Sequence, residues 1–314
     1  MRLFIIKGLI VVILAGTTNP VYCDETTMGK DKACSNPSPN ARDKGLSLLS
    51  FANHPLFAAK GPSKDDVFQG GGGDCYFLST LAALADADPD FIRRAVVHLT
   101  DGTFSVRFFQ ENGAQTFVHV TADLWVDNSG NLRYARLGQQ GALWVPILEK
   151  AYAVCRRNKN SYDSIAGGGG KTLNNLVWKY DHIIIDETGV NPEDVVNWFN
   201  RGATDGDMKN TINERVRAFL NKVDAQRRAG KGLVMGGPAG FSNRTPLVYS
   251  STGRAHGTYR RGQHIYMIDH VETDGGGNYT GIVLRDPGGA YRRITDFVRI
   301  FFCTGSAATV EPQG

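Results

Sequence analysis

The sequence is organised around residues 69–75, which read Gln-Gly-Gly-Gly-Gly-Asp-Cys. An apolar pattern with a period of 3.6 residues begins directly after this stretch. Its members are Phe77, Leu78, Leu81, Leu84 and Ala85. The pattern predicts a helix that starts at Cys75 and ends near residues 86–88.

The chemistry of this stretch points to catalysis by Cys75. At the first turn of a helix, unpaired N–H groups and the helix dipole favour a thiolate over a thiol, and a thiolate is a nucleophile. Glycine backbone lets a substrate chain approach closely. The Cys75 N–H and the Gln69 side-chain amide can both donate to a developing oxyanion. The alternative is that Cys75 is a small buried apolar residue beside a flexible glycine loop.

Residues 1–23 are predicted to be a secretory signal peptide. Arg2 and Lys7 flank a short apolar start, and a second apolar run extends from Leu9 to Ala15. This run is too short to span a bilayer comfortably. We therefore expect cleavage rather than a stable membrane span, and a secreted or periplasmic protein.

The residues around the expected cleavage site predict a free leader. Residues 20–22, Pro-Val-Tyr, match the small-residue pattern of lipoproteins poorly, so a lipid anchor at Cys23 is not expected. Residues 24–45 are polar and show no periodicity, which predicts a flexible leader.

Composition and charge narrow the class of protein. The chain has 314 residues, of which 41% are hydrophobic, and this is enough for one large or two ordinary domains. The net charge of +4 falls to about +2 without Arg2 and Lys7, so we expect no nucleic-acid partner. The cysteines contain no CxxC pair or zinc pattern, and their spacing leaves disulfide connectivity open. They are Cys23, Cys34, Cys75, Cys155 and Cys303.

The first part of the mature chain is predicted to be mostly helical. Asp88-Pro89 has the residues of an N-cap and first helical position, so a second helix follows the Cys75 helix. Alternating patterns predict strands at 103–109 and 116–120, and a helix buried on most sides is expected at 143–154. We interpret residues 46–178 as a helical lobe that carries the nucleophile.

The later part is predicted to be rich in strands. A short helix begins at Asn191, and Asp207 is expected to cap a longer helix. Strands are predicted at 232–235, 264–269 and 281–286. Residues 179–314 thus form a β-rich lobe, the fold class is α+β, and a cleft between the lobes is the natural ligand site.

His264 is the candidate base among seven histidines. It begins a predicted strand, and Asp286 ends the next one, so antiparallel pairing would bring the two side chains together. A cysteine, a histidine and a carboxylate that orients it form a thiol acyl-transfer site. The other six histidines have no arranged partner. They are His54, His98, His119, His182, His256 and His270.

Several segments resemble the core of calpain-type cysteine proteases. The segment from Asp66 to Leu78 carries the family's Gln-Gly-x-x-Gly-Asp-Cys-aromatic signature. Further similar segments follow in the family's order over about residues 55–305. They are Pro55-Leu56-Phe57, Leu148-Glu149-Lys150-Ala151-Tyr152-Ala153, Gln263-His264-Ile265-Tyr266, Arg285-Asp286-Pro287-Gly288 and, as the closing strand, Asp296-Phe297 with Cys303.

The resemblance implies a papain-like, two-lobed endopeptidase that acts on polypeptides. By position, Cys75 is the nucleophile, His264 the base and Gln69 a donor to the oxyanion. Asp286 stands where the family has asparagine. Asp66 and Glu149 match acidic positions with which family members bind calcium.

The departures from the family pattern limit what can be carried over. Gly288 replaces a tryptophan that shields the site, and no calcium-binding hand motif is present. We therefore expect that no cofactor is required and that calcium is possible only at one remnant site, formed by Asp66 and Glu149. The alternative is that Glu149 pairs with a cation.

Two other functional classes remain open at this point. An acyltransferase or amidase could use the same thiol–imidazole pair, and acceptor dependence of the product would identify it. A binding module with a decayed site is the second alternative, and a thiol probe would distinguish it. We expect a monomer with a polypeptide as its partner.

Overall fold

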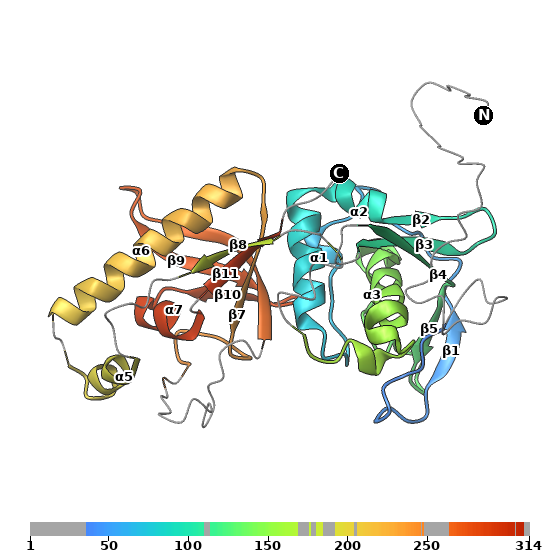
Figure 1. The fold of residues 1–314 in the computed structure, drawn as a ribbon, viewed down its shortest axis with the longest axis horizontal. Coiled ribbons are helices and arrows are strands. Elements are labelled where there is room, and N and C mark those ends of the chain that lie inside the picture. Colours follow the sequence, from blue (N-terminus) through green and yellow to red (C-terminus); the bar gives the residue numbers. More distant parts are fainter. Residues whose placement is uncertain are drawn as a thin grey trace, which may run out of the picture.

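The computed structural model describes residues 36–109, 114–168, 176, 180–184, 192–203, 206–245, 247, 264–304 and 306–310. These residues form an α+β fold (Figure 1). Below, the N-terminal half means described residues 36–168, and the C-terminal half means described residues 180–310. No helix among the described residues has both the length and the apolar content needed to cross a bilayer.

Helices and short strands alternate in the N-terminal half. Its elements are β1 (Ser47–Ser50), η1 (Lys64–Asp66), α1 (Cys75–Ala87), α2 (Pro89–Ala95), β2 (Val96–His98), β3 (Phe104–Phe109), β4 (Gln115–Val120), β5 (Asp123–Val126), η2 (Gln139–Gly141), α3 (Trp144–Cys155), η3 (Arg156–Asn158) and η4 (Tyr162–Ser164). Strands β2, β3 and β4 form one antiparallel sheet, and β1 pairs with β5 in another.

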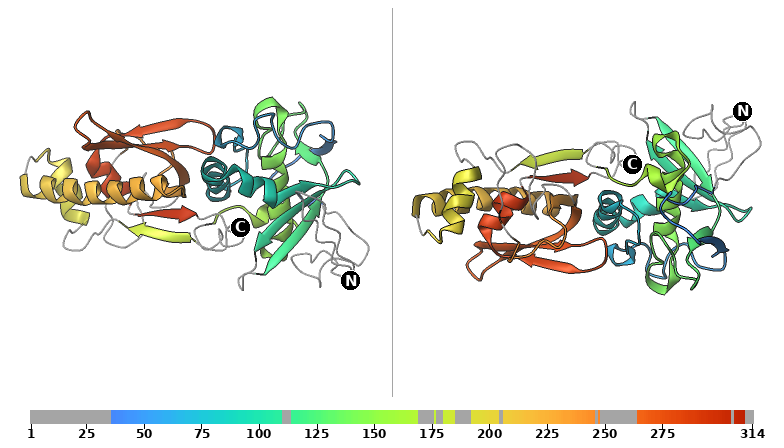
Figure 2. Two further views of the ribbon diagram at one scale, coloured as in Figure 1. Left: turned by 90° about the horizontal axis from the view of Figure 1, so that it is seen from above. Right: turned by 90° about the horizontal axis from the view of Figure 1, so that it is seen from below.

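The C-terminal half is built on a six-stranded antiparallel sheet of order β10-β9-β8-β7-β11-β6. Its elements are β6 (Tyr180–Ile184), α5 (Pro192–Asn200), α6 (Gly206–Arg228), β7 (Gly232–Gly237), β8 (His264–Thr273), β9 (Tyr279–Arg285), β10 (Tyr291–Ile294), α7 (Phe297–Thr304) and β11 (Ser306–Val310). Strands of this sheet lie on both sides of α6 in Figure 2, so the sheet curves around that helix.

Two hydrophobic cores share the central strands of this sheet. Side chains of successive residues in a strand point to opposite faces. In β8, Met267 belongs to the core around α1 and α3, whereas Tyr266 and Ile268 belong to the core around α6 and α7. In β7, Val234 and Leu233 divide in the same way. One sheet therefore joins the two cores.

Most of the predicted elements are confirmed. The first helix starts at Cys75, and the side chain of Asp88 accepts hydrogen bonds from two backbone N–H groups of α2, as an N-cap does. The predicted strands correspond to β3, β4, β7, β8 and β9, and the predicted buried helix to α3. Asp207 lies one residue inside α6 rather than before it, because the helix begins at Gly206.

Other expectations are corrected by tertiary contacts. Residues 36–45 of the expected flexible leader pack on the rest of the N-terminal half: the Trp125 indole donates to Pro37 O (2.8 Å), and Arg133 donates to Asp43 (2.6 Å). Residues 297–304, expected as a closing strand, form helix α7. The strand that follows is β11, which pairs with both β6 and β7.

The lobe boundary at 178/179 and the residues before 36 lie outside the described residues. The same holds for His256 and for Gln263, the residue before His264. The lobe limits, the signal peptide and the first part of the leader stay predictions.

Helix α1 approaches β7 closely because β7 begins with glycine. A Cβ atom at Gly232 would lie 2.8 Å from the carbonyl oxygen of Ala83 in α1 and 2.8 Å from Val310 Cγ2 in β11. The Ala83 backbone and the buried Val310 side chain thus occupy the space that any residue larger than glycine would need at position 232.

We predict that Gly232→Ala lowers the free energy of unfolding by roughly 1–3 kcal/mol, because α1 must move away from the sheet. Chemical denaturation measures this change. Gly206→Ala is the matched control, since a Cβ atom there meets no atom within 4 Å. Equal stability of the two variants would contradict the close approach.

Candidate active site

Cys75 occupies the first position of α1, with Asp74 as the residue before it. Its side chain is partly exposed and carries a thiol rather than a disulfide. The carbonyl oxygen of Asp74 accepts the first hydrogen bonds of the helix, from Phe77 N (2.8 Å) and Leu78 N (3.1 Å). The positive end of the helix dipole therefore lies at the sulfur.

His264 and Asp286 come together because β8 and β9 pair antiparallel. The pair Met267–Arg285 sets the register, and Asp286 follows directly after β9. His264 Nε2 lies 3.4 Å from Asp286 Oδ2, an ion-pair distance that falls short of a well-directed hydrogen bond. The Tyr266 ring and the imidazole pack in a T-shaped arrangement, with ring centres 4.7 Å apart.

Electrostatics favour the charged form of His264. Burial by itself lowers the pKa of His264, but the contacts with Asp286 and the Cys75 side chain raise the pKa from 6.5 to about 9. Burial raises the pKa of Asp286, while His264 and the Gly288 N–H bring it below its ordinary value. Cys75, His264 and Asp286 thus form one electrostatically coupled group.

The Asp286 carboxylate has two separate roles. Its Oδ1 accepts a hydrogen bond from the N–H of Gly288 (2.9 Å) and so closes the turn after β9. Its Oδ2 faces His264. Closing the turn fixes the carboxylate, so one side chain both ends the strand and faces the imidazole.

The Gln69 side chain lies within its own loop. Its Nε2 donates to Gly72 O (2.9 Å) and to Asp74 Oδ1 (3.2 Å), so both amide hydrogens have acceptors. The Gln69 backbone N–H donates to Pro287 O (2.8 Å), next to Asp286. This bond ties the glycine loop to the turn that carries Asp286. Donation to an oxyanion would require the amide to release one of its present acceptors.

A buried hydroxyl connects the two sides of the site. Ser79, one helical turn after Cys75, is fully buried, and its Oγ donates to the carbonyl oxygen of Ile265 (2.7 Å). Because Ile265 follows His264, this bond fixes β8 against α1. The sequence analysis missed Ser79, although a polar residue beside Leu78 and Leu81 was a visible signal.

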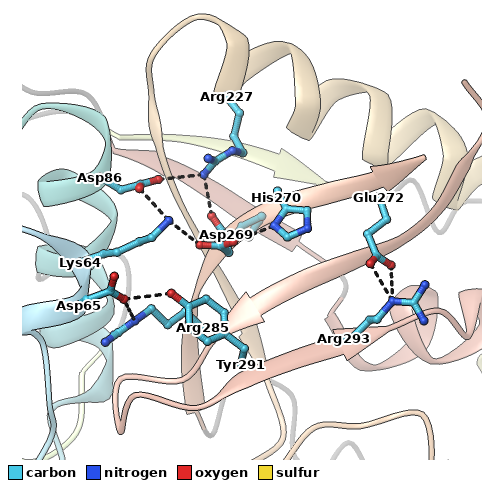
Figure 3. Close-up of polar contacts among 11 residues, drawn as sticks. Lys64, Asp65, Asp86, Arg227, Asp269, His270, Glu272, Arg285, Tyr291 and Arg293 are labelled. Atoms are coloured by element: carbon cyan, nitrogen blue, oxygen red, sulfur yellow. Dashed lines mark hydrogen bonds and ion pairs between the residues drawn. The ribbon is translucent and has the colours of Figure 1, made fainter. Parts of the chain in front are cut away.

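Charged side chains also join the two halves away from the thiol (Figure 3). Lys64 Nζ lies 2.9 Å from Asp86 Oδ1 of α1 and 2.7 Å from Asp269 Oδ1 of β8. Arg227 of α6 binds the other oxygen of Asp86 at 3.2 Å. His270 Nδ1 lies 2.7 Å from Asp269 Oδ2, so the expectation that His270 has no arranged partner is wrong.

A second group of polar contacts continues this junction. Tyr291 donates from its hydroxyl to Asp65 Oδ1 (3.0 Å), and Arg285 Nε lies 3.5 Å from the same oxygen. Arg285 is buried and also donates to Val67 O (3.0 Å). Residues 64–67 of the N-terminal half therefore contact β8, β9 and β10 through polar groups.

Asp66 and Glu149 have separate partners in the structure, and calcium binding at these two residues stays a prediction. Asp66 is buried, and its two oxygens accept hydrogen bonds from Ser63 N, Gln139 N and the Trp144 indole at 2.8–2.9 Å. The Glu149 carboxyl instead contacts that of Asp74. Calcium needs several oxygen atoms converging on one point. Among the described residues, no group of three or more His, Cys, Asp or Glu side chains has this arrangement.

Comparison with known proteins identifies the family. Residues 41–217, more than half of the chain, match the calpain family of cysteine proteases. The chain therefore belongs to the calpain family of cysteine proteases, which confirms the family predicted from the motifs. The matched range includes Gln69 and Cys75 but ends before His264 and Asp286.

Individual relatives agree with this assignment. The chain is 33% identical over 139 residues to the calpain-type cysteine protease DEK1 of Zea mays, covering 42% of this chain and 6% of that protein. It is 33% identical over 122 residues to the calpain-1 catalytic subunit of Bos taurus and 35% identical over 124 residues to calpain-12 of Homo sapiens. Each of these two alignments covers 38% of this chain and 16% of the relative. The chain thus spans less than a fifth of the length of these relatives.

We predict that Asp286→Asn lowers the upper pH limit of thiol reactivity by about one pH unit. The carboxylate stabilises imidazolium, so its removal lowers the pKa of His264 from about 9, and the proton leaves at lower pH. The rate of Cys75 alkylation against pH measures this limit.

Asp194→Asn, which removes an exposed carboxylate on α5, is the control and should leave the limit in place. The raised pKa of His264 also makes the stability of the fold depend on pH. The charged imidazole stabilises the fold fully below pH 6.5, and this contribution is lost as the pH rises through about 9. An Asp286→Asn limit identical to that of the wild type would show that Asp286 serves only the turn.

We predict that Lys64→Met lowers the free energy of unfolding by roughly 1–3 kcal/mol, because Asp86 and Asp269 lose their shared cation. Denaturant unfolding measures the loss. Arg293→Met is the control: Arg293 binds Glu272 at 2.7 Å within the C-terminal half, but its side chain is 63% exposed. Its removal should change little. A Lys64→Met protein as stable as the control would show that the junction contributes no stability.

Proposed function

We propose that this chain is a papain-like, two-lobed cysteine endopeptidase that hydrolyses peptide bonds of protein substrates through Cys75, His264 and Asp286. One observation carries the proposal. In a calpain-family chain, a thiol at the start of a helix is coupled to a histidine that lies 3.4 Å from a carboxylate.

The first chemical step forms an acyl-enzyme. The Cys75 thiolate attacks the scissile carbonyl carbon and forms a C–S bond, and the carbonyl oxygen becomes an oxyanion. The Cys75 backbone N–H donates to this oxyanion, and Gln69 donates once its amide leaves Gly72 O or Asp74. Protonated His264 gives its proton to the leaving amine as the C–N bond breaks. The product is a thioester on Cys75 and a free amino terminus.

The second step releases the acyl group. Neutral His264 removes a proton from water, the hydroxide attacks the thioester, and the C–S bond breaks. The carboxylic acid leaves, and the thiolate–imidazolium pair returns. Asp286 favours imidazolium throughout, because the negative carboxylate lies at ion-pair distance from the ring.

We extend the proposal to the setting of the reaction. Residues 1–23 direct export, the chain works as a monomer, and no cofactor is required. The amino-terminal apolar pattern supports export. The three N–H groups that already bind the Asp66 carboxylate support a reaction without a cofactor.

We predict that Cys75→Ala abolishes peptide cleavage, with a loss of at least roughly 10³-fold in kcat/KM, because only the nucleophilic sulfur is removed. Cleavage of a denatured protein substrate, with an epoxide inhibitor of thiol proteases as a label, measures this. Circular dichroism of the variant checks its fold. Labelling without hydrolysis, and product only when an amine acceptor is added, would identify an acyltransferase instead.

Calcium should have little effect on this activity. We predict that a chelator changes kcat/KM by no more than about twofold, because the Asp66 oxygens already accept N–H groups. Activity assays with a chelator, then with excess calcium or magnesium, measure the effect. Complete loss in the chelator that calcium alone reverses would refute this prediction.

A further inference from the structure

Two buried carboxyl groups meet directly beneath the nucleophile. Asp74, the residue before Cys75, is fully buried, and Glu149 of α3 is 1% exposed. A Cβ atom at Gly72 would lie 2.7 Å from Asp74 Oδ1 and 3.6 Å from Glu149 Oε1, so both side chains close around the glycine loop. Buried acidic side chains are rare unless they are paired.

The hydrogen bonds leave one oxygen of each carboxyl group without a donor. Asp74 Oδ1 accepts the Gln69 amide at 3.2 Å, and Glu149 Oε2 accepts the N–H of Ala135 at 2.9 Å. Among the described residues, Asp74 Oδ2 and Glu149 Oε1 are buried and meet no donor. The two side chains lie within hydrogen-bonding reach of each other.

A single proton satisfies both oxygens. An ionised carboxylate only accepts hydrogen bonds, whereas a carboxylic acid also donates one O–H. Two carboxylates in contact would repel each other and leave two buried oxygens unsatisfied, which is costly at low dielectric. One acid and one carboxylate remove both costs.

The groups around Asp74 and Glu149 can compensate the negative charge of one carboxylate. Burial raises the pKa of Asp74 and of Glu149, and the neighbouring charge of Asp74 raises the pKa of Glu149 further. Arg156 and the Gln69 amide act in the opposite direction on Asp74. Glu149 is therefore the acid, and Asp74 is the carboxylate.

Arg156 is the cation that acts on this pair. Its guanidinium donates to Ser164 O (2.7 Å) and Gly167 O (2.9 Å), so the backbone fixes its place. Among the described residues, the other titratable groups that interact with the pair are phenols, which are neutral at ordinary pH. They belong to Tyr76 and Tyr162.

We propose that Glu149 and Asp74 share one proton and that this acid–carboxylate pair is a positioning element for the Gln69–Cys75 loop. The pair links α3 to the residue before the nucleophile. Asp74 in turn holds the Gln69 amide through Oδ1. The backbone N–H of Cys75 is thereby aimed, although neither carboxyl group touches substrate. The positioning role rests on the proposed protease activity, whereas the shared proton does not.

Infrared spectroscopy tests the shared proton without any need for activity. At neutral pH the wild-type protein should show the C=O stretching band of a buried protonated carboxyl group. Glu149→Gln should lose this band, because an amide N–H replaces the acid O–H toward Asp74. Glu272→Gln removes a carboxylate that is ion-paired with Arg293 and should leave the band unchanged. Absence of the band in the wild type, or its persistence in Glu149→Gln, overturns the proposal.

Kinetics test the positioning role. Glu149→Gln keeps a donor toward Asp74, so kcat should stay within about threefold of the wild type, whereas Glu149→Leu leaves Asp74 unpaired and should lower kcat about tenfold or more. KM should change little in both variants. Equal losses of kcat in the two variants overturn the positioning role. If Glu149→Leu does not fold, a loss of kcat above threefold in Glu149→Gln overturns it instead. A wild-type protein that cleaves no peptide refutes the proposed function, and the infrared comparison still decides the shared proton.

Discussion

The site depends on the packing of helix α1 across strands β7 and β8. Gly232 lets the helix backbone come close to the sheet, and the buried Ser79 hydroxyl binds the carbonyl oxygen beside His264. Cys75 and His264, which are far apart in the chain, are thus held by one helix–sheet contact. Because both elements belong to a shared hydrophobic core, a shift of α1 would disturb core packing as well as the site.

Polar contacts complete this junction where apolar packing ends. Lys64 lies between a carboxylate of α1 and one of β8, and the N–H of Gln69 binds the turn after β9. Figure 3 shows the Lys64 contacts, which add directional interactions to the apolar contact between the halves. In the described residues, side-chain contacts within the chain therefore join its two halves.

The carboxyl groups show that the surroundings of a side chain decide its role, because the same chemical group serves differently at each position. Asp66 meets three N–H donors and serves as a structural acceptor. Asp74 and Glu149 meet each other, and Asp286 meets a histidine and a turn. All four residues lie within the sequence motifs, and from sequence alone each could be a metal ligand, a proton donor or a helix or turn cap.

The sequence by itself determined the features that depend on neighbours in the chain. The apolar period placed the start of α1 at Cys75, and Asp88-Pro89 marked the start of α2. The strands predicted at 264–269 and 281–286 correspond to β8 and β9, and their antiparallel pairing brings His264 to Asp286. Tertiary structure alone decided that residues 297–304 form a helix, that β11 lies between β7 and β6, and that Glu149 meets Asp74. The reason is physical: periodicity and capping act within a few residues, whereas the partners of a buried polar group are set by segments that only folding brings together.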